Sequence, residues 1–291
     1  LYDPRMCLLC NALRPAPSSP WSARRAFVLA SGAALAGPAW AQIDVGPPSS
    51  LRTLIPAEAL ESAAAEQYHE LLAQARAKRA LAPDNHPQLL RLRAIARRLI
   101  PFAPQWNPRA AQWRWEVNLI GSKQINAFCM PGGKIAFFTG ILEQLRLTDD
   151  EAAMVMGHEM AHALREHARA QLAKTRATSL GLTLGAQLLG LGELGNTVAD
   201  LGTRLLALKF SRADETEADL VGLELGARAG YDPHAAVTLW QKMNQVAAGA
   251  GLEFLSTHPS GPERIQTLEQ NVPRVEGLYL AARSGALAPE R

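Results

Sequence analysis

Apolar positions recur at helical spacing over most of this chain. Between residues 148 and 175 they stand three and four positions apart, which is the spacing of one helix face. The same pattern, rich in Ala, Leu, Arg and Gln, predicts further helices over 57–81, 88–100, 177–192, 211–229 and 234–247. Residues 112–120 and 134–139 favour strands. We therefore expect an α+β fold, mainly helical, with a small antiparallel sheet.

The helix predicted over 148–175 carries a start signal and a chemical motif. Thr148 and Glu151 form a capping box, in which both side chains bond first-turn amides. The sequence H-E-x-x-H follows at His158, Glu159 and His162. Positions i and i+4 share a helix face, so two imidazoles can hold zinc while Glu159 takes a proton from water that the metal activates. This pattern predicts a metalloprotease, and the alternative is a surface helix with two solvated histidines.

A catalytic zinc needs a third protein ligand and an open position for water. Four acids lie within six residues of a second predicted helix, at Asp214, Glu215, Glu217 and Asp219. Glu215 and Asp219 share a face, so that one can bind metal while the other orients a ligand histidine. Spacing alone does not choose among the four acids, and a solvated acidic face is the alternative.

Four segments, in order, resemble the motifs of a known zinc metallopeptidase family. They are Asn126–Ile135 (N-A-F-x-x-P-G-G-x-I), Asp150–His162 (D-E-x-A-x-x-x-G-H-E-x-A-H), Ser211–Asp219 (S-R-x-x-E-x-x-A-D) and His258–Ile265 (H-P-x-x-x-x-R-I). The family includes HtpX, the CAAX prenyl protease, mitochondrial Oma-type proteases, and periplasmic BepA and LoiP. The resemblance covers about residues 55–272 and implies a zincin-like domain.

The resemblance implies a ligand set. One zinc ion per chain would be held by His158, His162 and Glu215, with Asp219 as the partner that orients a ligand. Glu159 would be the general base, which later delivers its proton to the leaving amine.

The resemblance also implies a substrate strand beside the metal. Asn126, Ala127, Gly132 and Gly133 belong to the stretch that would accept an extended substrate by strand addition. An ordinary core hairpin is the alternative, and both interpretations can hold together.

His258 and Arg264 are polar residues late in the chain. Either could stabilise the oxyanion that forms when water attacks the peptide carbonyl. In BepA-like relatives the matching histidine can instead occupy the open metal position, which would make the resting enzyme latent. The alternative is that His258 has only a structural role, as a helix cap.

The first 41 residues have the features of an export signal. Arg24 and Arg25 precede a short apolar run, and Ala39-Trp40-Ala41 offers a cleavage site before Gln42. The twin arginines are compatible with the twin-arginine route. We therefore expect residues 42–291 to be the metallopeptidase domain, in the periplasm.

The segment 177–209 is apolar and glycine-rich. Its uncharged run from Ala177 to Gly192 is shorter than the ~20 residues of a membrane span, so we expect a buried or lid helix. This favours the periplasmic branch of the family, with contact at the membrane periphery left open.

Charge and cysteines exclude other classes. Without residues 1–41, which hold four Lys/Arg and one Asp, the chain has 30 − 4 = 26 basic and 27 − 1 = 26 acidic residues. Residues 42–291 therefore have a net charge of zero, and the +3 of the whole chain gives no support for nucleic-acid binding. Cys7 and Cys10 fall in the predicted signal, so Cys129 alone remains and no intramolecular disulfide can form.

The sequence thus favours a zinc endopeptidase that cleaves misfolded or unassembled envelope proteins, with the outer-membrane assembly machinery as a candidate partner. A mostly latent, chaperone-like metal-binding protein is the alternative, although a pure binding module has no need of Glu159. A structural zinc protein is disfavoured, because H-E-x-x-H with a distant Glu leaves an open coordination position.

Overall fold

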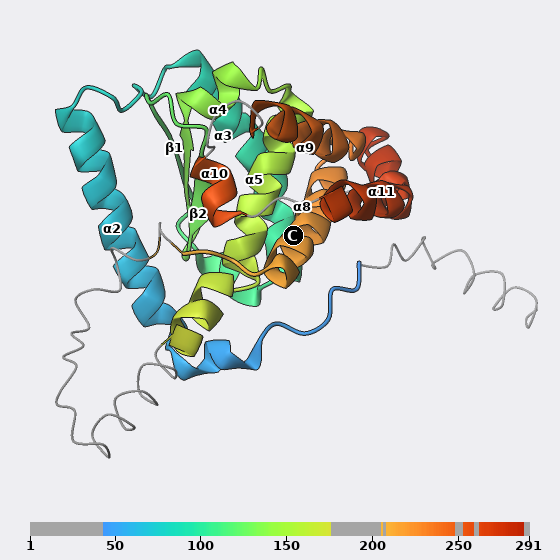
Figure 1. Ribbon diagram of the computed structural model, residues 1–291, viewed down its shortest axis with the longest axis horizontal. Helices are drawn as coiled ribbons and strands as arrows, with labels where there is room; N and C mark the ends of the chain where they lie inside the picture. Colours follow the sequence, from blue (N-terminus) through green and yellow to red (C-terminus); the bar gives the residue numbers. More distant parts are fainter. Residues whose placement is uncertain (1–42, 176–204, 206–207, 248–252, 259–261, 288–291) are drawn as a thin grey trace, which may run out of the picture. The chain divides into compact units, whose positions relative to one another are not determined.

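The computed structural model describes residues 43–175, 205, 208–247, 253–258 and 262–287 (Figure 1). Residues 42–291 form one compact unit. Its α-helices are α2 (Ala57–Ala77), α3 (Pro87–Leu99), α4 (Thr139–Gln144), α5 (Asp149–Leu164), α8 (Arg212–Arg228), α9 (His234–Ala247), α10 (Glu253–Thr257) and α11 (Pro262–Arg283). Its 3-10 helices are η1 (Ser50–Leu54), η2 (Ile100–Gln105) and η3 (Pro108–Gln112), and its strands are β1 (Glu116–Ile120), β2 (Ala127–Met130) and β3 (Lys134–Phe138).

The three strands form one sheet in the order β1-β3-β2. β2 and β3 are an antiparallel hairpin, whereas β1 runs parallel to β3. The expected antiparallel sheet is therefore wrong in this detail, and the sheet is mixed. The reason is the connection after β1, which carries the chain past β3 to its far side, so that β2 lies at the edge and β3 returns beside β1.

Both faces of the sheet are covered, as the alternation of side chains in a strand requires. Ile135 and Phe137 of β3 join the larger core with α3 and α5, while Ala136 joins a smaller core with α2. Tyr68 of α2 is fully buried, and its hydroxyl donates a 2.5 Å hydrogen bond to the carbonyl of Ile135. Figure 1 shows α2 on one side of the strands and α5 on the other.

α5 is the central helix of the larger core. It packs against α8, α9, α3 and strand β2, and α11 packs against α8 and α9. From Glu151 to Leu164 every residue of α5 is buried. The fold class predicted from the sequence is thus confirmed: helices dominate and a small sheet lies beside the central helix.

Two predicted helices end earlier than the apolar pattern indicated. α2 stops at Ala77 rather than 81, because Arg79 has a positive φ of 54° and Leu81 then forms a bridge to Ile120 at the sheet. The helix expected over 148–175 is interrupted at Arg165 and Glu166, and residues 167–175 form a separate helical stretch. Glu166 has a φ of 58°, a left-handed conformation that ends a helix.

Some predictions fall outside the described residues. These are the export signal over 1–41 and the helix over 177–192. Among the helices that the structure describes, none has the length and the apolar run needed to cross a membrane.

Candidate metal centre and active site

The H-E-x-x-H motif lies in the buried part of α5. The predicted capping box is present: Thr148 Oγ1 accepts a bond from the Glu151 amide at 3.2 Å, and Glu151 Oε2 accepts one from the Thr148 amide at 2.8 Å. His158, Glu159 and His162 are each no more than 4% exposed. This burial excludes the surface helix with two solvated histidines.

Two glycines bring α5 and α8 into backbone contact beside the motif. A Cβ placed on Gly222 would lie 2.7 Å from the amide nitrogen of His158, and a Cβ on Gly157 would lie 2.8 Å from the carbonyl oxygen of Gly222. Only residues without a side chain permit this approach. The close crossing carries the acidic face of α8 to the histidines.

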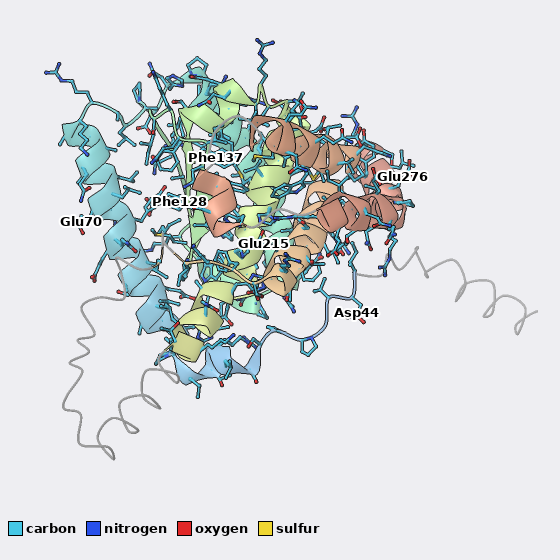
Figure 2. The ribbon with its side chains drawn as sticks, viewed as in Figure 1. Asp44, Glu70, Phe128, Phe137, Glu215 and Glu276 are labelled. Carbon is cyan, nitrogen blue, oxygen red and sulfur yellow. The ribbon has the colours of Figure 1, made fainter. Side chains whose placement is uncertain are left out.

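Glu215 is the acid that reaches both histidines. Its Oε2 lies 3.4 Å from Nε2 of His158, and its Oε1 lies 3.4 Å from Nε2 of His162. The two histidine Nε2 atoms are 3.1 Å apart. Figure 2 shows Glu215 at the centre of the described side chains, whereas Glu70 and Glu276 lie at the outside.

His258, which directly follows α10, brings a fourth donor to the same point. Its Nδ1 lies 2.9 Å from Glu215 Oε1 and 3.4 Å from His158 Nε2. Ligand atoms of His158, His162, Glu215 and His258 all lie within 4.8 Å of one another, and all four residues are buried.

The spacing of these donors fits a tetrahedral metal ion. Zinc binds imidazole nitrogen and carboxylate oxygen at about 2.0–2.2 Å, which sets neighbouring ligand atoms about 3.3–3.5 Å apart in a tetrahedron. The distances given above run from 2.9 to 3.4 Å. Imidazoles with one carboxylate are also a donor set that zinc commonly takes. The residues present therefore fit a metal ion of this kind.

The other three acids of α8 have different positions. Asp219 Oδ1 lies 3.0 Å from Nδ1 of His158, on the side of the ring away from the donors. Asp214 caps α8 by bonding Ser211, and Glu217 pairs with Arg165. Geometry thus separates the four acids that spacing left equivalent: Glu215 lies among the donors, and Asp219 lies behind a histidine.

Arg264 holds the two site carboxylates in place. It donates to both oxygens of Asp219, and its guanidinium lies 2.7 Å from Oε2 of Glu215. The guanidinium also lies 3.6 Å above the ring of Trp240, a cation–π contact. One guanidinium nitrogen also lies 3.2 Å from Nδ1 and 3.3 Å from Nε2 of His158, so Arg264 contacts the donor set itself.

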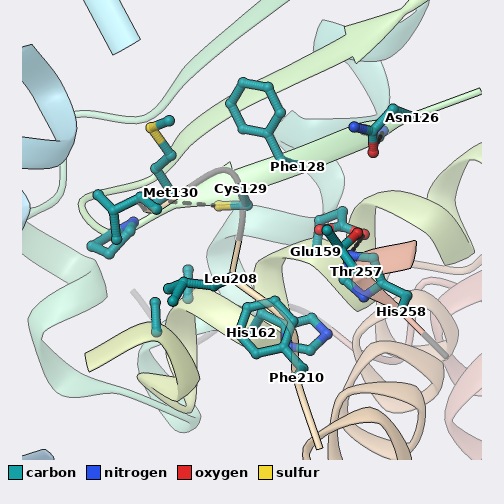
Figure 3. A pocket seen from close by; sticks show the side chains of 15 residues that line it. Asn126, Phe128, Cys129, Met130, Glu159, His162, Leu208, Phe210, Thr257 and His258 are labelled. Carbon is teal, nitrogen blue, oxygen red and sulfur yellow. Dashed lines mark hydrogen bonds and ion pairs between the residues drawn. The ribbon is translucent and has the colours of Figure 1, made fainter. Parts of the chain in front are cut away.

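Glu159 faces a pocket between α5 and strand β2 (Figure 3). Its Oε1 lies 3.7 Å from Nε2 of His258 and has no hydrogen-bond partner among the described residues. His162 and His258 line the same pocket, and its remaining wall is mainly apolar, formed by Ala127, Phe128, Met130, Pro131, Ala163, Ala168, Leu205, Leu208 and Phe210.

The predicted substrate-strand residues divide into two groups. Asn126 and Ala127 line the pocket, at the start of β2, which is an edge of the described sheet. Gly132 and Gly133 form the turn between β2 and β3, as the Pro-Gly-Gly sequence indicates, and their part in binding substrate stays a prediction. Their φ values of 82° and 78° suit a tight turn, and a Cβ on Gly133 would lie 2.7 Å from the Trp115 ring.

Sequence reasoning missed two residues that contact His162. Phe210 stacks on the His162 ring, with centroids 4.0 Å apart. His167 places its Nδ1 2.9 Å from Nδ1 of His162. The presence of a further histidine five residues after the motif is the one signal in the sequence, but a continuous helix would direct it elsewhere.

Burial and close charges shift the site pKa values in different directions. Burial raises the pKa of Glu159 and lowers that of His162 well below its usual range. For His158, burial lowers the pKa, but hydrogen bonds to Asp219 and Glu215 outweigh it and raise it to about 9. Burial raises the pKa of Glu215, but bonds from three histidines outweigh this and hold it far below the usual range, so Glu215 is ionised.

The helical fold, the small sheet and the buried donor set define a zincin-like metallopeptidase domain. The chain belongs to peptidase family M48, whose family model matches residues 88–272. The resemblance found in the four sequence motifs is thereby confirmed.

Curated relatives agree with this assignment. The chain is 38% identical over 197 residues to "Mitochondrial metalloendopeptidase OMA1" of Schizosaccharomyces pombe, covering 67% of this chain and 56% of the relative. It is 28% identical over 203 residues to "Metalloprotease LoiP" of Escherichia coli, covering 67% and 75%. It is 32% identical over 161 residues to the "Beta-barrel assembly-enhancing protease" of Escherichia coli, covering 50% and 32%. The chain thus spans little more than half of the first of these relatives.

Proposed function

We propose that this chain is a zinc-dependent endopeptidase whose metal ligands are His158, His162 and Glu215. The observation that carries the proposal is the buried donor set with Glu159 beside it, both at a pocket along an edge strand. Bound there, zinc would supply Lewis-acid activation of water and of the scissile carbonyl.

The side chains of the site carry out proton transfer and hold the metal ligands in position. Glu159, whose pKa burial raises, takes a proton from the attacking water and delivers it to the leaving amine. Asp219 holds the outer nitrogen of His158 and so fixes the direction of its Nε2. Arg264 acts as a positioning residue for Asp219 and Glu215, and its part in stabilising the oxyanion stays a prediction.

The substrate class follows from the edge strand. β2 can pair with an extended peptide through backbone hydrogen bonds, which demand little of the peptide's sequence. Unfolded segments present such backbone, so misfolded or unassembled envelope proteins are the proposed substrates. The name of one relative, beta-barrel assembly-enhancing protease, supports β-barrel assembly as the setting, with the assembly machinery as the proposed partner. The periplasm is the proposed location, on the strength of the expected export signal.

The position of His258 favours a second candidate, a mostly latent, chaperone-like metal-binding protein. With His258 Nδ1 included, the donor set has four members, and a zinc ion held by all four would have no position left for water. Activity would then require His258 to leave the donor set.

Cleavage of unfolded casein by the full chain with added zinc tests the proposal, with Glu159→Gln as the control variant. We expect the parent to cleave and the variant to lose about 10²–10⁴-fold in rate while keeping its zinc, because only the proton acceptor is removed. Zinc-independent cleavage, or equal rates for the two proteins, would contradict the assignment. Zinc binding without cleavage by the parent would favour the latent candidate.

A further inference from the structure

The two motif histidines have different partners on their outer ring nitrogens. Nδ1 of His158 lies 3.0 Å from the Asp219 carboxylate, which is a common partner for a metal-binding histidine. Nδ1 of His162 lies 2.9 Å from Nδ1 of a third histidine, His167. Both rings of this second pair are buried, with centroids 4.9 Å apart and planes at 77°.

A break in the backbone makes the second contact possible. In a continuous helix, residues five apart point about 140° away from each other, so His167 could not face His162. The chain leaves α5 after Leu164, and Glu166 takes a left-handed φ of 58°. Ion pairs of Glu166 with Arg52 and Arg169 hold this turn.

The far side of the His167 ring meets a carboxylate. Its Nε2 lies 3.5 Å from Oε2 of Glu217 and 3.9 Å from Oδ1 of Asp214, which are ion-pair distances, and it forms no hydrogen bond among the described residues. Glu217 is in turn paired with Arg165. Arg165 also donates a 2.6 Å hydrogen bond to the carbonyl of Gly46. A chain of polar contacts therefore runs from His162 through His167 and Glu217 to the segment before η1.

Hydrogen-bond chemistry determines which nitrogen donates and which accepts in this series of contacts. A histidine that binds metal through Nε2 is neutral and carries its proton on Nδ1. Nδ1 of His162 must then donate, so Nδ1 of His167 must accept, and the proton of His167 lies on Nε2 toward Glu217. The nearby carboxylate thus favours, through its charge, the His167 tautomer that accepts from the metal ligand.

We propose that His167, with the Glu217 carboxylate 3.5 Å from its outer nitrogen, is a positioning residue that fixes the ring orientation and tautomer of the metal ligand His162. This rests on the proposed function, since it takes His162 as a ligand. None of the four sequence motifs contains His167, and it does not line the pocket.

Zinc affinity of the full chain, measured by competition with a chelator, tests the proposal in three variants. His167→Leu removes the acceptor, and we expect it to weaken zinc binding about 10- to 100-fold. His167→Asn returns an acceptor oxygen near the Nδ1 position and should stay within about threefold of the parent. His234→Asn, at an exposed histidine that begins α9, is the control and should not differ from the parent.

Substitution of cobalt for zinc gives an absorption spectrum that a general loss of stability would not change. The d–d absorption bands of the cobalt protein report ligand geometry, and they should change in His167→Leu but not in His167→Asn.

Parental zinc affinity and cobalt bands in His167→Leu would overturn the proposal, as would an Asn variant as weak as the Leu variant. If His167→Leu fails to fold, parental affinity in Glu217→Gln together with weakened binding in His167→Asn would overturn it. A parent that binds no zinc would overturn the proposed function and this inference together, whereas a parent that binds zinc without cleaving casein would leave only the proposed function in doubt.

Discussion

At the residue scale, the contacts of His258 fit two different roles. Its Nδ1 lies among the metal donors, and its Nε2 lies 3.7 Å from Glu159. The first contact suits a group that closes the site, and the second suits one that acts in catalysis. Figure 3 shows the side chain beside Glu159 at the pocket.

We expect His258→Ala to raise the rate of casein cleavage, because it removes the fourth donor and leaves an open coordination position. A tenfold increase would mean that the closed arrangement is favoured by about 1.4 kcal/mol. Initial rates at saturating zinc are the measurement, and His234→Ala is the control. Lost activity would instead support a role in transition-state stabilisation, and an unchanged rate would rule out both roles.

At the scale of elements, the crossing of α5 and α8 depends on a glycine. A Cβ on Gly222 would press on the α5 backbone, 2.7 Å from the His158 nitrogen and 2.8 Å from the carbonyl carbon of Gly157. A Cβ on Gly226, in the same helix, would meet the flexible end of the Met154 side chain. The two positions therefore differ in whether the neighbour can move.

Gly222→Ala should lower the free energy of unfolding by about 1–3 kcal/mol, because two helix backbones must separate. Gly226→Ala should cost less, since Met154 can change rotamer and alanine favours a helix over glycine by about 1 kcal/mol. Urea unfolding of the two variants measures this difference. If Gly226→Ala proves the more destabilising, the backbone contact does not limit the crossing.

The start of α5 is joined to α9 by one carboxylate. Glu151 Oε2 accepts from the Thr148 amide and pairs with Lys242 at 2.6 Å, and its Oε1 accepts from the Thr238 hydroxyl at 3.0 Å. Burial raises the pKa of Glu151, but the bonds from Lys242, Thr148 and Thr238 outweigh it and lower the pKa below its ordinary value. The ionised form is therefore the one that stabilises the fold.

This lowered pKa sets the pH dependence of a Glu151→Gln variant. A carboxylate with a lowered pKa in the folded state contributes stability above its unfolded pKa of about 4.3, and this is lost as pH falls through the folded pKa. At pH 7 we expect the variant to be less stable by about 1–3 kcal/mol. The deficit should shrink below about pH 4. Urea unfolding of the metal-free proteins at several pH values measures it, with exposed Glu143→Gln as the control; a deficit independent of pH would contradict the ionic role.

At the scale of the whole molecule, the metal site joins distant parts of the chain. His158 and His162 come from α5, Glu215 from α8, and His258 from the residue after α10. A metal ion bound by this set links segments about a hundred residues apart in sequence, and it binds the folded chain rather than the unfolded one.

Removal of zinc should therefore lower the thermal midpoint. At free zinc 100-fold above the dissociation constant, binding adds about 2.7 kcal/mol of stability. For a domain of this size that corresponds to about 5–10 °C. Calorimetry of the zinc-loaded and chelator-treated protein measures the shift, and Glu215→Gln should show a smaller one. Equal midpoints with and without zinc in the parent would contradict the proposed site.

The sequence by itself determined what depends on neighbours along the chain. Helical spacing and the capping box at Thr148 and Glu151 place α5, and the i,i+4 spacing of His158 and His162 places two imidazoles on one face. These features are local, because a helix is built from contacts within one turn. The family resemblance added the order of the site segments and the expectation that Glu215 is a ligand, that Asp219 orients one and that His258 can occupy the open position. The family itself is confirmed.

Only the tertiary structure decided which distant groups meet. Helical spacing left four acids equivalent, and the crossing of α8 over α5 is what brings Glu215 and Asp219 to the histidines. The contact of His167 with His162 depends on the left-handed turn at Glu166. The parallel pairing of β1 with β3 and the place of His258 among the donors likewise join segments separated along the chain. Such contacts are set by packing between elements, and the spacing of residues within one element does not specify it.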